Sequence, residues 1–186
     1  MPASIVSVNV GLPREVEWRD KRVLTGIWKE PVVGPVRVGK LNLDGDGQGD
    51  PSVHGGAAKA VYAYPSEHYA LWRPELDLPD LAWGSFGENL TTVGLTEATV
   101  RIGDRLRIGT TELQVTRPRL PCFKLHVRFD RADVVRRFLT TGRTGFYLSV
   151  LMEGHVEAGD AIEFVASSER GPTVAEVVAL KASGEE

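Results

Sequence analysis

The chain has 186 residues, with 22 Lys and Arg against 25 Asp and Glu and a formal net charge of −3 at pH 7. This length suits one domain with a sizeable core. The small net charge does not favour a nucleic acid polymer or an anionic membrane as a partner. The sequence begins without the features of a signal peptide, and no stretch approaches the roughly 20 apolar residues of a membrane span. With a single cysteine, we expect a cytoplasmic protein.

Short strands dominate the hydrophobic pattern, because runs rich in Val, Ile, Thr and aromatic residues alternate with Gly, Asp and Pro. We expect strands at residues 4–10, 25–28, 37–43, 59–64, 88–93, 105–108, 112–116, 145–151 and 161–166. Helical signals are fewer. They predict helices at residues 66–73, where a proline ends the pattern, at residues 130–139 and at residues 174–181.

These elements predict a mostly β fold, a closed or half-closed β-barrel with a few short helices, because closure removes exposed strand edges. Two similar segments, residues 100–104 and 156–160, place Gly-Asp at a turn before an amphipathic strand. Such turns are typical of β-hairpins in a small barrel. We expect one domain over residues 1–168, followed at residues 169–186 by a short C-terminal helix and a flexible tail.

Cys122 lies in a segment with the sequence RPRLPCFKL. The two prolines make the backbone rigid, and the Arg and Lys side chains around the thiol favour the thiolate. A thiolate serves either as a nucleophile or as a ligand to a soft metal. Because free cysteine is also among the most buried residue types, this segment by itself leaves packing, nucleophilic chemistry and metal ligation open.

The longest irregular run, residues 45–56, is rich in glycine and acidic residues and ends in His54-Gly55-Gly56. Such a loop is either a surface connection or a wall of a ligand site. The glycines would let backbone N–H groups approach an anion, and Lys59 adds a cation nearby. Alternatively, His54 caps a turn and Lys59 is a solvated strand end. A calcium loop is not favoured, because the glutamate that closes an EF-hand loop is absent.

Two further segments carry candidate polar side chains. Glu88 and Asn89 follow a glycine-framed turn, where they either hold the loop or present an acceptor and an amide to a ligand. Arg143 either meets a phosphate or covers apolar surface with its stem. The sequence contains no second cysteine, HExxH motif, dinucleotide fingerprint or P-loop. A thiol hydrolase or transferase that pairs Cys122 with His54 stays open.

Three longer segments, residues 44–69, 84–125 and 142–160, together resemble the MOSC domain, which is named after the C-terminal domain of molybdenum cofactor sulfurase. The resemblance extends from residue 4 to residue 164 and is strongest to bacterial stand-alone members of the YiiM type. It implies a MOSC-type β-barrel that binds the molybdenum cofactor, in which a pterin dithiolene holds the metal.

The resemblance also implies roles for particular residues. Cys122 would be the protein ligand to molybdenum. The remaining candidates to hold the cofactor match motifs of the family and are His54, Gly55, Gly56, Lys59, Asn89, Arg119, Lys124 and Arg143. The implied reaction is reductive removal of oxygen from N-hydroxylated compounds such as N-hydroxylated bases and amidoximes. His54 or Glu88 is the candidate proton donor to the departing hydroxyl.

The implied enzyme also requires a source of electrons. Because the sequence carries no flavin, haem or iron–sulfur motif, we expect an external electron donor, a flavoprotein or ferredoxin-type reductase. An alternative is a non-catalytic carrier of the molybdenum cofactor or of sulfur, with a persulfide on Cys122. We expect a monomer or a homodimer.

Overall fold

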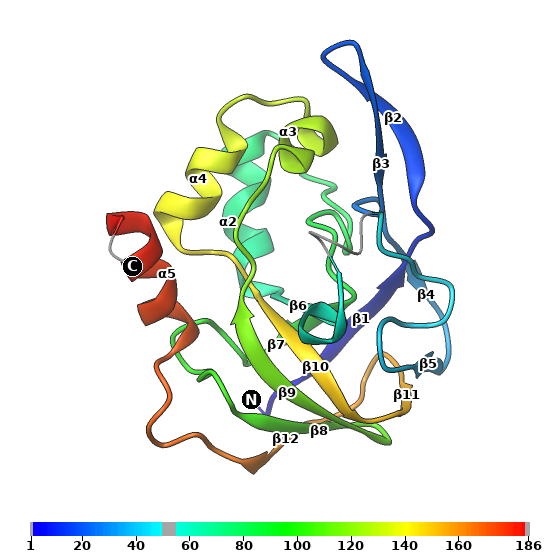
Figure 1. Ribbon diagram of the computed structural model, residues 1–186, viewed down its shortest axis with the longest axis vertical. Helices are drawn as coiled ribbons and strands as arrows, with labels where there is room; N and C mark the ends of the chain where they lie inside the picture. Colours follow the sequence, from blue (N-terminus) through cyan, green and yellow to red (C-terminus); the bar gives the residue numbers. More distant parts are fainter. Residues whose placement is uncertain (1, 50–54, 185–186) are drawn as a thin grey trace.

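The computed structural model describes residues 2–49 and 55–184. A large curved β-sheet forms one part of the molecule, and most of the helices gather at one end of it (Figure 1). The helices of the described ranges are η1 (Ala57–Lys59), a short 3-10 helix, α2 (Glu67–Leu76), α3 (Lys124–Phe129), α4 (Val134–Thr141) and α5 (Val174–Ser183).

The strands follow one another closely along the chain. They are β1 (Ser4–Val10), β2 (Arg14–Trp18), β3 (Lys21–Thr25), β4 (Glu30–Val32), β5 (Val36–Val38), β6 (Val61–Pro65), β7 (Leu90–Val93), β8 (Arg105–Ile108), β9 (Thr111–Pro118), β10 (Phe146–Met152), β11 (Gly154–Val156) and β12 (Ile162–Ala166). Eight of them form the main sheet, in the order β12-β8-β9-β10-β6-β7-β1-β4. Strands β6 and β7 pair in parallel, which requires a crossover connection, here α2. The β2–β3 hairpin and the β5–β11 pair are separate two-stranded sheets.

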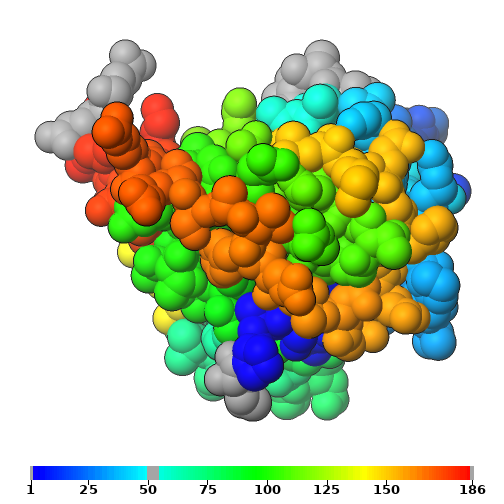
Figure 2. All heavy atoms as spheres, turned by 90° about the horizontal axis from the view of Figure 1, so that it is seen from below, coloured from blue at the N-terminus to red at the C-terminus, as the bar shows by residue number. Residues whose placement is uncertain are grey.

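The structure is mostly β, but the main sheet does not close into the expected barrel. Strands β12 and β4 are its two ends. The start of β1 nevertheless meets the segment before β12 through a bridge between Ser4 and Ala161, and the backbone N–H of Ile5 donates to the carbonyl of Asp160 at 2.9 Å. Figure 2 shows the N-terminal residues against this orange segment. The sheet is thus curved and tied at one place, without a continuous ladder around it.

Two hydrophobic cores hold these elements together. The sheet core consists of aliphatic side chains, mainly Val, Leu and Ile. The helix core is aromatic and packs α2 and α4 against β6. In it, the rings of Tyr64 and Phe86 stack with centroids 4.7 Å apart, and the indole N–H of Trp72 donates to the Tyr64 hydroxyl at 2.7 Å. Large buried aromatic rings contribute strongly to stability, so the helix core fixes one wall of the molecule.

Several elements differ from the sequence-based prediction. Residues 25–28 are not a separate strand; Thr25 ends β3 of the β2–β3 hairpin, and residues 26–28 are irregular. The helix expected at residues 130–139 begins at Val134, because Asp130 adopts the left-handed conformation that ends α3, a helix that was not predicted. Helix α2 continues through Pro74 to Leu76. Pro74 has no backbone N–H to donate to the preceding turn, so it removes one hydrogen bond from the helix close to its C-terminal end.

The C-terminal helix α5 is present, as expected. Its N-terminus carries a capping box, in which the Glu176 backbone N–H donates to the Thr173 hydroxyl at 3.1 Å. Val174 and Val178 belong to the sheet core, so α5 packs on the same core as the strands. A domain boundary at residue 168 stays a prediction. In the described ranges, none of the helices combines the length and apolar character needed to cross a bilayer.

Candidate functional site

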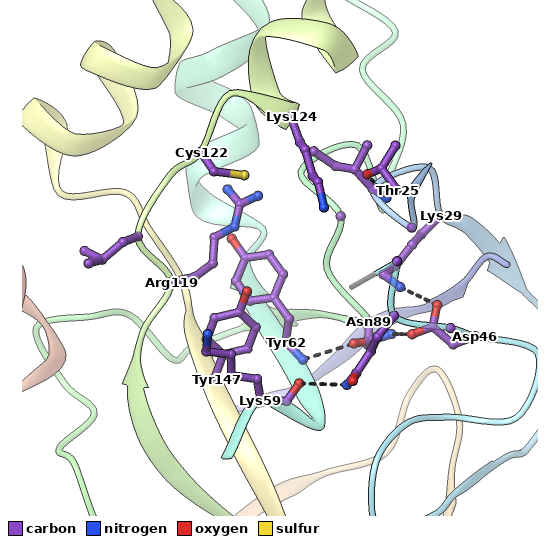
Figure 3. Close-up of a pocket in the computed structure, with 17 residues that line it drawn as sticks. Thr25, Lys29, Asp46, Lys59, Tyr62, Asn89, Arg119, Cys122, Lys124 and Tyr147 are labelled. Atoms are coloured by element: carbon purple, nitrogen blue, oxygen red, sulfur yellow. Dashed lines mark hydrogen bonds and ion pairs between the residues drawn. The ribbon is translucent and has the colours of Figure 1, made fainter. Parts of the chain in front are cut away.

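A cleft lies between the β2–β3 hairpin, the glycine-rich loop and the segment that leads from β9 into α3 (Figure 3). Six separate parts of the chain line it: Thr25, Gly26, Ile27 and Lys29; Asp46, Gly47, Gln48 and Gly49; Lys59 and Tyr62; Gly87 and Asn89; Arg119, Leu120, Cys122 and Lys124; and Tyr147 on β10. Because these segments are remote in sequence, the cleft is a product of the tertiary fold.

The thiol of Cys122 faces the cleft beside the guanidinium of Arg119 (Figure 3). Cys122 lies in the short connection between β9 and α3. In the described ranges, no three His, Cys, Asp or Glu side chains converge as a metal site. Cys122 is the sulfur ligand that the described lining of the cleft offers to a metal.

Arg119 is buried, with 7% of its surface exposed. Its guanidinium carbon lies 5.4 Å from the ring centroid of Tyr62 and 5.2 Å from that of Phe138. Burial alone would lower the pKa of Arg119, but the phenol groups of Tyr62 and Tyr147 and the Cys122 thiol outweigh burial, so that this pKa is raised. Its Nη1 is buried and finds no hydrogen-bond partner among the described residues. Such an N–H group is costly to leave unpaired and is available to a ligand.

A buried polar network forms the opposite wall. Lys29 Nζ and Asp46 Oδ1 form an ion pair, and Asp46 also accepts hydrogen bonds from the Gly11 backbone at 3.0 Å and from Asn89 Nδ2 at 2.8 Å. Asn89 Oδ1 accepts from the Tyr62 backbone at 3.1 Å. Burial lowers the pKa of Lys29, and the nearby Asp46 opposes this shift. The Asn89 amide therefore ties the loop to the sheet.

The glycines of the irregular run permit close packing of backbones. A Cβ atom on Gly26 would lie 2.5 Å from the carbonyl oxygen of Gly47, and one on Gly49 would lie 2.8 Å from that of Leu24. Side chains at these positions would force the loop away from the hairpin. The described part of the run is thus a wall of the cleft, which is one of the two interpretations that the sequence left open.

Two tyrosines that the sequence analysis did not select also line the cleft. Tyr62 on β6 and Tyr147 on β10 are register partners, and their ring centroids lie 5.3 Å apart. The Tyr62 hydroxyl donates to the Thr144 carbonyl at 2.7 Å. Burial raises the pKa of both phenols, and Arg119 opposes this shift. Their alternation with core residues predicted a strand, but nothing local to either tyrosine indicated a ligand site.

Glu88 does not line the cleft. Its carboxylate is fully buried and accepts hydrogen bonds from the Gly84 backbone at 2.9 Å, the Phe86 backbone at 3.1 Å, the Thr91 hydroxyl at 2.9 Å and the Tyr69 hydroxyl. Burial raises the pKa of Glu88, and these hydrogen bonds oppose the shift. Glu88 therefore holds the glycine-framed turn, and this position weighs against its predicted role as a proton donor.

The other selected residues divide into two groups. Lys59 and Lys124 line the cleft together with the thiol, whereas Gly55, Gly56 and Arg143 do not. The Gly56 backbone N–H donates to Gln48 Oε1 at 3.1 Å. Arg143 pairs with Glu75 at 2.7 Å, away from the cleft. His54 lies outside the described residues. The sequence analysis did not select Lys29, because this residue lies in an irregular segment that contains no recognisable motif.

Comparison with known proteins identifies the family. Residues 50–163 match the model of the MOSC domain. The chain belongs to the MOSC domain family. Over 171 residues it is 44% identical to YflK of Bacillus subtilis (strain 168), spanning 92% of this chain and 77% of YflK. It is 40% identical over 146 residues to YiiM of Escherichia coli (strain K12), spanning 76% of this chain and 64% of YiiM. Membership in this family associates the chain with the molybdenum cofactor.

Solved structures and one further relative agree with this assignment. YiiM from Geobacillus stearothermophilus superposes with a TM-score of 0.81 at 36% identity, covering 98% of this chain and 85% of that one. YiiM from Escherichia coli superposes with a TM-score of 0.69 at 32% identity, covering 96% of this chain and 75% of that one. A protein named reductase from Gibberella moniliformis (strain M3125 / FGSC 7600) is 38% identical over 148 residues, which are 77% of this MOSC chain and 26% of that protein.

Proposed function

We propose that this MOSC protein binds the molybdenum cofactor in the cleft and reduces N-hydroxylated compounds with electrons from an external flavoprotein or ferredoxin-type reductase. The observation that carries the proposal is the juxtaposition of the Cys122 thiol with the buried Arg119, whose Nη1 has no partner among the described residues. Family membership and the relative named reductase support it.

The residues of the cleft fit this cofactor. A pterin dithiolene with a phosphate is strongly anionic, and positive side chains outnumber negative ones in the lining: Lys29, Lys59, Arg119 and Lys124 against Asp46. Because Asp46 is already paired with Lys29, it adds little repulsion. The thiolate of Cys122 is the soft ligand that molybdenum would take.

Each residue contributes a separate task in this proposal. Cys122 ligates the metal, and the buried Arg119 donates to the anionic ligand. Lys59 and Lys124 supply further positive charge at the cleft. The glycine-rich wall and the Asn89–Asp46 hydrogen bond give the cleft its shape. When bound, the molybdenum supplies the two-electron chemistry that removes oxygen from the N-hydroxyl group.

An activity assay on protein from a cofactor-competent host tests the proposal. Reduced methyl viologen serves as the artificial electron donor and benzamidoxime as the substrate. We expect benzamidine to form with wild type and not with Cys122→Ala. Molybdenum-loaded wild-type protein that produces no benzamidine would contradict the reductase assignment and favour the alternative of a cofactor carrier.

A further inference from the structure

The proposed reduction requires a proton donor, and this inference rests on that reaction. Overall, R–NH–OH takes up two electrons from the reductase and two protons, and gives R–NH₂ and water. One proton goes to nitrogen, and the other goes to the oxygen as the N–O bond breaks. Proton transfer to a leaving oxygen is a task for a positioned side chain. The described residues of the cleft can therefore be searched for a hydroxyl or ammonium proton that is not already engaged.

Most of the acidic hydrogens near the thiol have another partner. The Tyr62 hydroxyl donates to the Thr144 carbonyl at 2.7 Å, and the Lys29 ammonium is paired with Asp46. Glu88 lies outside the cleft and accepts four hydrogen bonds. These groups would have to break existing interactions before they could donate a proton to a substrate.

Tyr147 differs from these groups in the nature of its neighbour. Its side chain lines the cleft, and Figure 3 shows it close to the side chain of Arg119. A guanidinium has N–H donors and no acceptor, so the Tyr147 hydroxyl cannot donate to Arg119. The hydroxyl proton of Tyr147 can therefore point at a ligand bound in the cleft.

We propose that Tyr147 is the catalytic proton donor, whose hydroxyl hydrogen-bonds the oxygen of the N-hydroxyl group and protonates that oxygen as the N–O bond breaks. The adjacent Arg119 stabilises the tyrosinate that forms, through its positive charge. Water that enters the open cleft then returns the proton to Tyr147. The structure thus assigns the role to a residue that lies beside the thiol, in place of Glu88.

The protonation state of Tyr147 agrees with this role. Burial raises the pKa of its phenol, and Arg119 opposes that rise. The phenol is therefore protonated at neutral pH. Arg119 reduces the cost of losing the proton, as an efficient acid requires.

Binding without turnover gives the first test. With no reductant present, the affinities of benzamidoxime and benzamidine are measured by calorimetry for wild type and for Tyr147→Phe. We expect the variant to bind benzamidoxime about three- to tenfold more weakly, the effect of one lost hydrogen bond. Benzamidine lacks the oxygen, so its affinity should not change. Equal weakening of both ligands would contradict the assignment.

Turnover gives the second test. Tyr147→Phe is expected to lower kcat for benzamidoxime about 100-fold, as for loss of a general acid, at unchanged molybdenum content. The matched control is Tyr64→Phe, which removes a buried phenol that does not line the cleft and should lower only the melting temperature. An inactive wild type would overturn the proposed function, whereas an active wild type with a fully active Tyr147→Phe would overturn the role of Tyr147 alone.

Discussion

Glu88 and Asn89 are neighbours in the chain with different environments. Both lie in the irregular segment that precedes β7, where Asn89 reaches the cleft while Glu88 turns to Tyr69 of the helix core. The sequence showed two polar residues after a glycine turn, but not which of them would face a ligand. The answer depends on Tyr69 and Thr91, whose hydroxyl groups donate to Glu88.

Replacement of Glu88 by Gln tests this structural role. The amide keeps the shape of the side chain but brings an NH₂ group to a position where the carboxylate accepts only hydrogen bonds. We expect a loss of about 1–3 kcal/mol in the free energy of unfolding, measured by urea denaturation. A variant of wild-type stability that has lost reductase activity would instead support the catalytic role predicted from the sequence.

The β2–β3 hairpin is one of the elements that the sequence pattern missed. Its strands are short, rich in charged residues and largely exposed, with Thr25 at the end of β3 buried, so they lack the runs of Val, Ile and Leu that indicate a buried strand. The hairpin is tied to α3 by Trp18, whose ring stacks on Phe123 with centroids 6.3 Å apart and lies 6.1 Å from the ring of His126. Because Phe123 directly follows Cys122 in the chain, we expect this contact to restrict access to the thiol.

Removal of the Trp18 ring should open this entrance. In cofactor-free protein, Trp18→Ala is expected to raise the rate at which Cys122 reacts with Ellman's reagent about two- to tenfold, the effect of losing an aromatic contact. The reading is unambiguous because the chain has one cysteine. Leu12→Ala, at an exposed residue outside the cleft lining, is the control and should react like wild type. Identical rates for all three proteins would show that the hairpin does not restrict access.

At the scale of the whole molecule, the sequence predicted most strands of the main sheet but not how they pair. Runs of Val, Leu and Ile indicate a strand wherever they occur, whereas pairing depends on contacts between distant segments. The cleft exists only because the parallel β6–β7 pair brings Asn89 next to Tyr62. The resemblance to MOSC domains selected Cys122, Arg119 and Lys124 as cofactor ligands, and these three residues line one cleft, but it offered no signal for Tyr147.

The buried tyrosines make the folded state sensitive to alkali. Burial raises the pKa of the phenols of Tyr62, Tyr64, Tyr69 and Tyr147 above the usual value of 10.0. Above pH 10 the unfolded chain loses these protons while the folded chain keeps them, so their contribution to stability is complete below pH 10 and is lost as the pH rises further. The lowered pKa of Lys29 has the opposite effect on stability, which rises with pH just below pH 10.5 on account of this group. The four tyrosines outnumber this single lysine, so we expect a net loss of stability in alkali.

A spectrophotometric titration checks this prediction. We expect tyrosinate absorbance near 295 nm to appear only together with loss of the circular dichroism signal, in one cooperative transition above pH 10. Tyrosinate that forms near pH 10 while the dichroism is still native would show that the pKa of the phenols is not raised in the folded protein, contrary to this structure.

Metal analysis tests the central claim most directly. Wild-type protein and Cys122→Ala are expressed in the same cofactor-competent host, and their molybdenum and pterin contents are measured side by side. If Cys122 ligates the metal in this cleft, wild type carries near-stoichiometric molybdenum with pterin, and the variant loses the metal or shows an altered absorption spectrum. Wild-type protein with neither molybdenum nor pterin, or a variant that retains both with an unchanged spectrum, would contradict the account.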